Sequence, residues 1–183
     1  MKRILVFICA CLITFWTSRI YSVNRNYTAP ETRYKNDSMI NIENLEVSFN
    51  HSCIYTCDEF ESEYKVEFGD VDSPDDIRII SACFDVRNTS ENDLAWDTVM
   101  DSLQCGFESL TWASSVDPSV TSVINTFYSD TLKAGATQRI GFATVMTRSS
   151  FREQSWEHLT ENRYYYVFAR QPEKIMIELD LSN

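Results

Sequence analysis

The sequence has little glycine, proline or histidine, and these shortages exclude several classes of protein. Only 4 of its 183 residues are glycine and 4 are proline, whereas collagen-like and low-complexity chains depend on both residues. The glycines Gly69, Gly106, Gly135 and Gly141 are scattered, so the chain has no Gly-rich phosphate-binding loop. Hydrophobic residues make up 44% of the chain and aromatic residues 13%. One ordered domain with a sizeable core is therefore expected.

Positive charge is also scarce. The chain has 16 Lys and Arg residues against 27 Asp and Glu residues, which gives a formal net charge of -11 at pH 7. A field of that sign repels phosphate backbones, so we expect no nucleic-acid partner. The same composition is typical of a well-solvated, soluble surface.

The chain begins with a short hydrophobic segment. Three residues, Met1-Lys2-Arg3, provide a cationic start, and the 13 residues from Ile4 to Trp16 carry no charge. A spanning helix prefers roughly 20 apolar residues, whereas this length is typical of the hydrophobic region of a signal peptide. No small-x-small cleavage motif follows, so an uncleaved signal anchor extending to Tyr21 stays open. A lipoprotein signal with Cys11 as the lipidated residue is a further alternative.

These features predict three parts. Residues 1–21 are a signal peptide or signal anchor, residues 22–38 are a polar stalk, and residues 39–183 are the folded domain. Membrane contact is expected only through residues 4–21. The domain itself is expected to be extracytoplasmic, either anchored at the cell membrane or secreted.

The sequence of the folded part predicts mostly β-structure. Residues 77–87 give the clearest strand, because Ala82, Phe84 and Val86 share one face while Cys83 lies on the other. A short helix is expected over 96–103 and a helical turn near 156–159. The remaining predicted strands are 39–49, 64–68, 107–112, 123–128, 138–146, 164–169 and 175–181. Such a series of short strands favours a β-sandwich over alternating βαβ units. The predicted core is Ala82, Phe84, Val86, Ile140, Phe142, Val167, Ile177 and Leu179.

Two segments together resemble a known family. The first is a strand ending in Asn-Thr-Ser, at residues 82–90 (ACFDVRNTS). The second is a Leu-x-x-Gly turn before an alternating strand, at residues 132–142 (LKAGATQRIGF). The pair resembles the telokin-like, immunoglobulin-like domains of extracytoplasmic proteins of Gram-positive bacteria, which are mostly lipoproteins of unknown function. The resemblance implies an immunoglobulin-like (telokin-like) β-sandwich over residues 39–181, with one or two short helices in its connections. It implies an extracytoplasmic location and provides no catalytic residues.

Four cysteines lie outside the N-terminal segment: Cys53, Cys57, Cys83 and Cys105. An even number in an exported domain favours disulfides. Among the three connectivities we favour Cys53–Cys57 with Cys83–Cys105. The alternative is a four-cysteine zinc site, but such sites usually bring their ligands in two close pairs, and only the first pair is close in sequence. We therefore expect no cofactor.

An acidic loop is the other candidate metal site. Asp70, Asp72, Asp75 and Asp76 lie within seven residues, and carboxylate clusters can hold calcium. An EF-hand loop needs Gly at its sixth position and Glu at its twelfth, where this sequence has Asp75 and Ser81. A solvated turn is the favoured interpretation.

Nothing in the sequence predicts an enzyme. His51 and His158 are the only histidines, and neither lies in a pattern that pairs a base with a nucleophile. A rival hypothesis is a hydrolase acting on envelope polymers. It would use carboxylates of the acidic loop or the pair Asp97 and Asp101, and it requires a cleft with two carboxylates on its walls.

Aromatic residues are the most distinctive candidates for recognition. Trp96, Trp112, Trp156 and the run Tyr164–Tyr166 suit glycan or protein binding if they are exposed. Strand alternation places Tyr165 opposite its two neighbours, so one face of this run is predicted to be core. We therefore expect a non-enzymatic, secreted or surface-anchored binding module whose partner is an unknown protein or glycan at the cell surface. A purely structural envelope component is the remaining alternative.

Overall fold

The computed structural model of the chain describes residues 16, 29–68, 73–125 and 129–181. The chain divides into two units, Met1–Pro30 and Glu31–Asn183, and the second unit is the folded domain. Most of the predicted signal segment, including Cys11, lies outside the described residues, as do residues 22–28 of the predicted stalk. Within the described part, no helix combines the length and apolar character needed to span a membrane.

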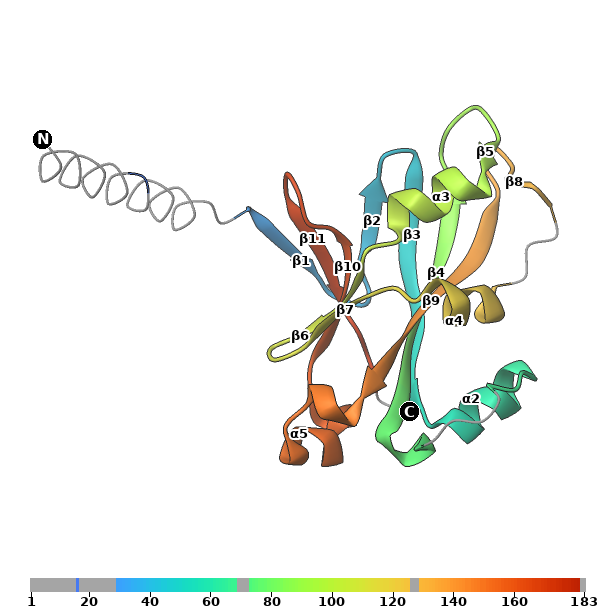
Figure 1. Cartoon of the computed structure of the whole chain (residues 1–183). Helices are drawn as coiled ribbons and strands as arrows, with labels where there is room; N and C mark the ends of the chain where they lie inside the picture. Colours follow the sequence, from blue (N-terminus) through green and yellow to red (C-terminus); the bar gives the residue numbers. More distant parts are fainter. Residues whose placement is uncertain (1–15, 17–28, 69–72, 126–128, 182–183) are drawn as a thin grey trace, which may run out of the picture. The chain divides into compact units, whose positions relative to one another are not determined.

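Two β-sheets form the domain (Figure 1). The four-stranded sheet has the order β2-β3-β4-β9, and the five-stranded sheet has the order β1-β11-β10-β6-β7. The strands of the first are β2 (Met39–Ile42), β3 (Leu45–Tyr55), β4 (Ile77–Asn88) and β9 (Thr137–Thr147). Those of the second are β1 (Glu31–Tyr34), β11 (Lys174–Glu178), β10 (Tyr164–Ala169), β6 (Gly106–Ser109) and β7 (Ala113–Ser115). A small third sheet pairs β5 (Leu94–Ala95) with β8 (Thr131–Leu132).

The inner faces of the two large sheets form one core, which confirms the predicted β-sandwich. Phe84 on β4 contacts the rings of Phe142 on β9 and Tyr166 on β10, with centroid distances of 6.3 and 5.0 Å. All eight predicted core residues are buried. The strand parity expected for residues 82–86 is also confirmed, because alternating apolar residues of β4 face the opposite sheet.

The two segments that carry the family resemblance contact each other. Asn88 ends β4, and its backbone N–H donates to the Ala136 carbonyl at 3.0 Å, while Gly135 N–H donates to the Asn88 carbonyl. The buried Asn88 side chain donates to the carbonyls of Leu132 and Asn92, at 3.0 and 2.8 Å. Gly135 has a φ of 72°, a left-handed conformation that favours glycine. The Asn at the strand end and the Leu-x-x-Gly turn are thus one hydrogen-bonded unit.

Helices cover the ends of the sandwich and the outer face of its four-stranded sheet. At opposite ends in Figure 1 lie α3 (Trp96–Leu103) and α5 (Glu153–Glu157), which bury Val99 and Trp156 in the main core. Two others, α2 (Cys57–Tyr64) and α4 (Pro118–Ile124), pack on the outer face of the four-stranded sheet in a second apolar cluster. Short 3-10 turns occupy Pro74–Asp76, Arg148–Ser150 and Leu159–Glu161. The described residues therefore hold more helices than the one or two expected.

Two side chains occupy the outer edge of β9: Thr121 belongs to α4, and Asn125 directly follows this helix. Asn125 donates through Nδ2 to the Gly141 carbonyl at 2.8 Å, and its Oδ1 accepts from Gly141 N–H at 2.9 Å. The Thr121 hydroxyl forms the same kind of double contact with Ala143. These side chains satisfy backbone groups that a further strand would otherwise pair with.

Several predicted elements differ in the structure. Glu31–Tyr34, placed in the predicted stalk, form β1 and pair in parallel with β11, so the folded part starts before residue 39. The predicted strand over 39–49 is a hairpin of β2 and β3, with a turn at Glu43. The predicted strand at 64–68 is wrong, because Tyr64 ends α2, and the prediction at 123–128 is wrong for Val123 and Ile124, which lie in α4. Residues 126–128 lie outside the described residues.

Candidate functional site

The first candidate site is a groove on the outer face of the five-stranded sheet, here called the Tyr165 groove. Its main lining residues are Arg33, Leu110, Asn162, Arg163, Tyr165 and Met176, and its volume is about 590 Å³. Strand alternation explains the arrangement: Tyr164 and Tyr166 point inward and are fully buried, so Tyr165 must point outward. The prediction that one face of this tyrosine run is core is confirmed.

A cation–π contact fixes the floor of the Tyr165 groove. The guanidinium carbon of Arg33 lies 5.4 Å from the centre of the Tyr165 ring, within the usual range for this contact. Arg33 also pairs with Glu31, and hydrogen bonding to that carboxylate raises the pKa of Arg33. Met176, on the neighbouring strand, is 1% exposed.

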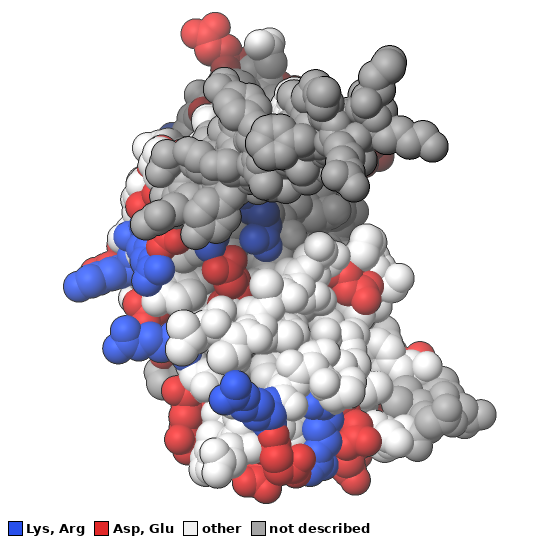
Figure 2. All heavy atoms as spheres, turned by 60° about the vertical axis from the view of Figure 1, so that its left-hand side comes forward, with Lys and Arg blue, Asp and Glu red and all other residues white. Residues whose placement is uncertain are grey.

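Leu110 provides an exposed apolar wall. It lies at the turn between β6 and β7 and is 99% exposed, whereas most large hydrophobic residues of the domain are buried. Charged residues near it are paired, because Glu108 accepts from Lys174 Nζ at 2.6 Å and lies 3.5 Å from Arg170 Nη1. Acidic and basic side chains also lie next to one another around a broad uncharged area on the face shown in Figure 2.

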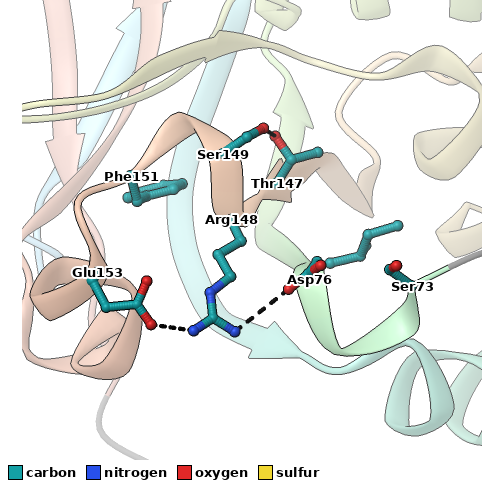
Figure 3. A pocket seen from close by; sticks show the side chains of 8 residues that line it. Ser73, Asp76, Thr147, Arg148, Ser149, Phe151 and Glu153 are labelled. Carbon is teal, nitrogen blue, oxygen red and sulfur yellow. Dashed lines mark hydrogen bonds and ion pairs between the residues drawn. The ribbon is translucent and has the colours of Figure 1, made fainter.

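The second candidate site, the Arg148 groove, lies beside the 3-10 turns at Pro74–Asp76 and Arg148–Ser150. Its volume is about 720 Å³. Figure 3 shows Arg148 extended between Asp76 and Glu153, with Phe151 beside it. Arg148 Nη1 lies 3.4 Å from Asp76 Oδ1, and Nη2 donates to Glu153. Hydrogen bonding to Glu153 is the main reason that the pKa of Arg148 is raised.

The hydrolase hypothesis required two carboxylates on the walls of a cleft, and Asp76 and Glu153 are the pair that the Arg148 groove offers. Each is bonded to the same guanidinium, an arrangement that holds carboxylates as acceptors rather than freeing one to deliver a proton. Asp97 and Asp101 are exposed on α3 and line neither groove.

The acidic loop does not gather its candidate ligands in the described part of the chain. Asp70 and Asp72 lie outside the described residues. Asp75 is exposed, and Asp76 is directed to Arg148. No group of three or more His, Cys, Asp or Glu residues placed to hold a metal occurs among the residues that the structure describes.

The structure corrects the disulfide prediction. No disulfide joins the cysteines Cys53, Cys57, Cys83 and Cys105 in the described chain. Cys83 lies on the outer face of β4, whereas Cys105 precedes β6 of the other sheet. A bridge between these two would have to cross the buried interior around Phe84, so this pairing is excluded by the fold. The Cys57 sulfur instead faces the Pro74 carbonyl at 4.0 Å.

The histidines are not placed for catalysis with a cysteine. His51 lies opposite Cys83 in the β3–β4 register, but its ring bonds to the Asn50 side chain at 2.8 Å. Burial raises the pKa of the Cys83 thiol to about 11, so the thiol stays protonated at neutral pH and is a poor nucleophile. His158 is exposed and pairs with Glu161 at 2.9 Å.

Sequence reasoning missed Arg33, Leu110 and Arg148. Arg33 and Arg148 are of a type common on surfaces, whereas Leu110 is of a type that is usually buried, and no motif surrounds any of them. Each belongs to a site only because distant segments meet. Among the predicted aromatics, Trp156 is buried, while Trp96 and Trp112 are partly buried against the core. Tyr165 alone of that set lines a groove described above.

Comparisons with known proteins concern the fold rather than the chemistry. Residues 21–175 match the model of a family described as a domain of unknown function, DUF5028. The structure is similar to that of an uncharacterized beta-sandwich protein from Clostridium difficile 630, with a TM-score of 0.50 and 13% identity over 84% of this chain and 99% of that one. This likeness agrees with the β-sandwich but carries no function at that identity.

Two further solved structures share less of the geometry. A conserved hypothetical protein from Bacillus anthracis has a TM-score of 0.46 and 11% identity, over 72% of this chain and 87% of that one. A functionally unknown protein from Listeria monocytogenes EGD-e has a TM-score of 0.45 and 13% identity, over 79% and 82%. No curated protein matches the sequence.

Proposed function

Because the chain belongs to the DUF5028 family, whose domain has no assigned function, we propose a function from the site itself. The chain is a non-enzymatic binding module, displayed outside the cell membrane, that recognises a protein partner through the Tyr165 groove. The observation that carries this proposal is Leu110, 99% exposed beside the stacked Arg33 and Tyr165 side chains.

The composition of the Tyr165 groove suits protein recognition. Tyr and Arg are enriched in the cores of protein interfaces, and here Arg33 and Tyr165 lie together over the buried Met176. The Arg33–Tyr165 stack holds both side chains in place before binding, so less conformational entropy is lost on association. A partner that covers Leu110 removes an apolar side chain from water.

The charge of the chain indicates the chemistry of the partner. A net charge of -11 attracts basic surfaces and accelerates encounters with them. Within the groove itself the charges are mixed, because Arg33, Arg163, Glu108 and Glu161 all line it. The partner is therefore a protein segment with an apolar side chain for the groove and flanking Lys or Arg residues. A nucleic acid does not fit this charge.

The display outside the membrane is supported by the N-terminal sequence. The cationic start and the apolar run from Ile4 to Trp16 are typical of an export signal. The resemblance to telokin-like extracytoplasmic domains of Gram-positive bacteria points to the same location. Residues 1–21 then deliver or anchor the β-sandwich, and a structural envelope component or a hydrolase are the competing functions.

Export has a direct test in a bacterial host that produces the full chain. Protease added to intact cells is expected to remove the domain, because the exported domain lies outside the membrane. A cytoplasmic marker protein in the same cells should stay intact. Full protection of the domain, with an exported control digested, would contradict the exported location.

Binding through the Tyr165 groove can be tested with a random peptide library displayed on phage, selected on the immobilised full chain in detergent. We expect enrichment of peptides that carry an apolar residue flanked by Lys or Arg. Leu110→Asp should abolish this enrichment, because it places a charge where the apolar anchor packs. Met39→Asp is the matched control, since Met39 is also exposed, at 59%, but lies on β2 and lines neither groove.

The outcome distinguishes peptide binding in the Tyr165 groove from nonspecific peptide binding. Enrichment that Leu110→Asp removes and Met39→Asp keeps supports the proposal. Equal enrichment on all three proteins, or enrichment of acidic peptides, would overturn it. Because affinity for a basic partner depends on charge, the selected peptides should also bind more weakly as salt increases.

A further inference from the structure

The Arg148 groove presents a dense alternation of hydrogen-bond donors and acceptors. The guanidinium of Arg148 has five N–H donors in a planar fork, and its two bonds to Asp76 and Glu153 hold that fork in place. Each carboxylate has a second oxygen able to accept. The hydroxyls of Thr147 and Ser149, which also line the groove, lie 3.3 Å apart, so neutral polar groups are present beside the charged ones.

One side of the Arg148 groove is apolar and rigid. Phe151 is half-buried, and its ring stacks on Trp112 with centroids 5.6 Å apart and an interplanar angle of 29°. The Trp156 ring lies 5.7 Å from Phe151 on another side. Arg78 in turn covers Trp156 at 5.4 Å. The aromatic wall is thus fixed by packing before any ligand arrives.

The charge of the Arg148 groove excludes some ligands. One guanidinium is flanked by two carboxylates, so the three groups together carry one net negative charge. Anionic ligands such as phosphates or uronic acids would meet that charge and the acidic chain around it. The favoured ligand is uncharged and carries many hydroxyl groups.

We propose that the Arg148 groove binds an uncharged saccharide. A sugar ring has an apolar face of C–H groups, which packs on Phe151 and Ile77, and adjacent hydroxyls, which pair with the fork of Arg148 and with Asp76 and Glu153. Figure 3 shows Asp76 and Glu153 on either side of the Arg148 fork. The volume of about 720 Å³ lies in the usual range for small-ligand sites. This site is separate from the Tyr165 groove.

The test uses an array of neutral, amino and uronic oligosaccharides, followed by saturation-transfer NMR with the best neutral oligosaccharide on the array. We expect the full chain to bind a subset of the neutral oligosaccharides. Arg148→Lys keeps the charge but loses the planar fork, and we expect it to weaken binding about tenfold or more. Arg139→Lys is the matched control: Arg139 lies on β9 and pairs with Asp85 at 3.1 Å, outside the groove, so binding should change less than about twofold.

The results discriminate between the two grooves and between ligand classes. Weakening by Arg148→Lys, with no effect of Arg139→Lys or Leu110→Asp and unchanged melting temperatures, supports the saccharide site. The absence of any neutral oligosaccharide signal overturns the proposal. Stronger binding of uronic acids, or equal weakening by both Arg variants, overturns it as well. None of these results depends on whether the Tyr165 groove binds a protein.

Discussion

Phe84→Ala is expected to lower the free energy of unfolding by about 3–5 kcal/mol, the usual range for truncating a buried Phe. Phe84 is fully buried and lies at the centre of the sandwich. Its ring contacts those of Phe49, Phe142, Tyr166 and Phe168, which come from both sheets. Truncation leaves a cavity that two rigid sheets cannot close. Chemical denaturation of the folded domain, followed by Trp fluorescence, measures the change.

Arg87→Ala is the control on the same strand. Arg87 is exposed and its pairing with Glu46, at 3.7 Å, is a surface contact, so its removal should cost less than about 0.5 kcal/mol. A comparable loss for both variants would mean that the loss of stability does not depend on whether the substituted side chain of β4 is buried. A loss near zero for Phe84→Ala would show that the parity of β4 is reversed.

Asn88→Ala should have the second-largest effect, a loss of about 2–4 kcal/mol. The Asn88 side chain is fully buried and forms four hydrogen bonds. Two are donated to the carbonyls of Asn92 and Leu132, and two are accepted from Ser90. The alanine leaves the buried Leu132 carbonyl without its partner, and it removes the contacts that hold the half-buried Ser90 and the exposed Asn92 in the turn. The thermal unfolding midpoint should fall by many degrees.

Asn36→Ala provides the comparison for Asn88. Asn36 is exposed and its Nδ2 donates to Asp180 at 3.3 Å, so its loss should change stability by less than about 0.5 kcal/mol. If Asn88→Ala were as mild as Asn36→Ala, the contact between the end of β4 and the Leu132–Gly135 turn would not stabilise the fold. The two segments that resemble the telokin-like family would then owe their pairing to something other than this side chain.

Strand faces could be read from the sequence because alternation is a local property. Ala82, Phe84 and Val86 alternate with polar residues, so their burial followed from the backbone period alone. The helix α2 had a local signal as well, since Thr56 and Glu59 form a capping box around its first turn. Asp117 followed by Pro118 marks the start of α4 in the same way. The apolar residues near these signals, at 64–68 and 123–128, also fit the strand period, so the sequence predicts strands there.

The candidate sites could not be read in that way. The Tyr165 groove needs β1 to lie in parallel beside β11, a pairing between segments about 140 residues apart. The Arg148 groove needs residue 76 to meet residue 148. Local patterns carry no record of such long-range neighbours. The Cys83–Cys105 pairing was wrong for the same reason, because spacing along the chain does not say which sheet a residue joins.

The side chains of Asn125 and Thr121, which bond to the edge of β9, affect how copies of this domain can pair through that strand. An edge strand of 11 residues with unpaired backbone groups is a template on which identical chains can stack into fibrils. Here the positions at Gly141 and Ala143 are already occupied from within the same molecule. An incoming strand would have to displace the Asn125 and Thr121 side chains before it could pair with β9 at these two positions.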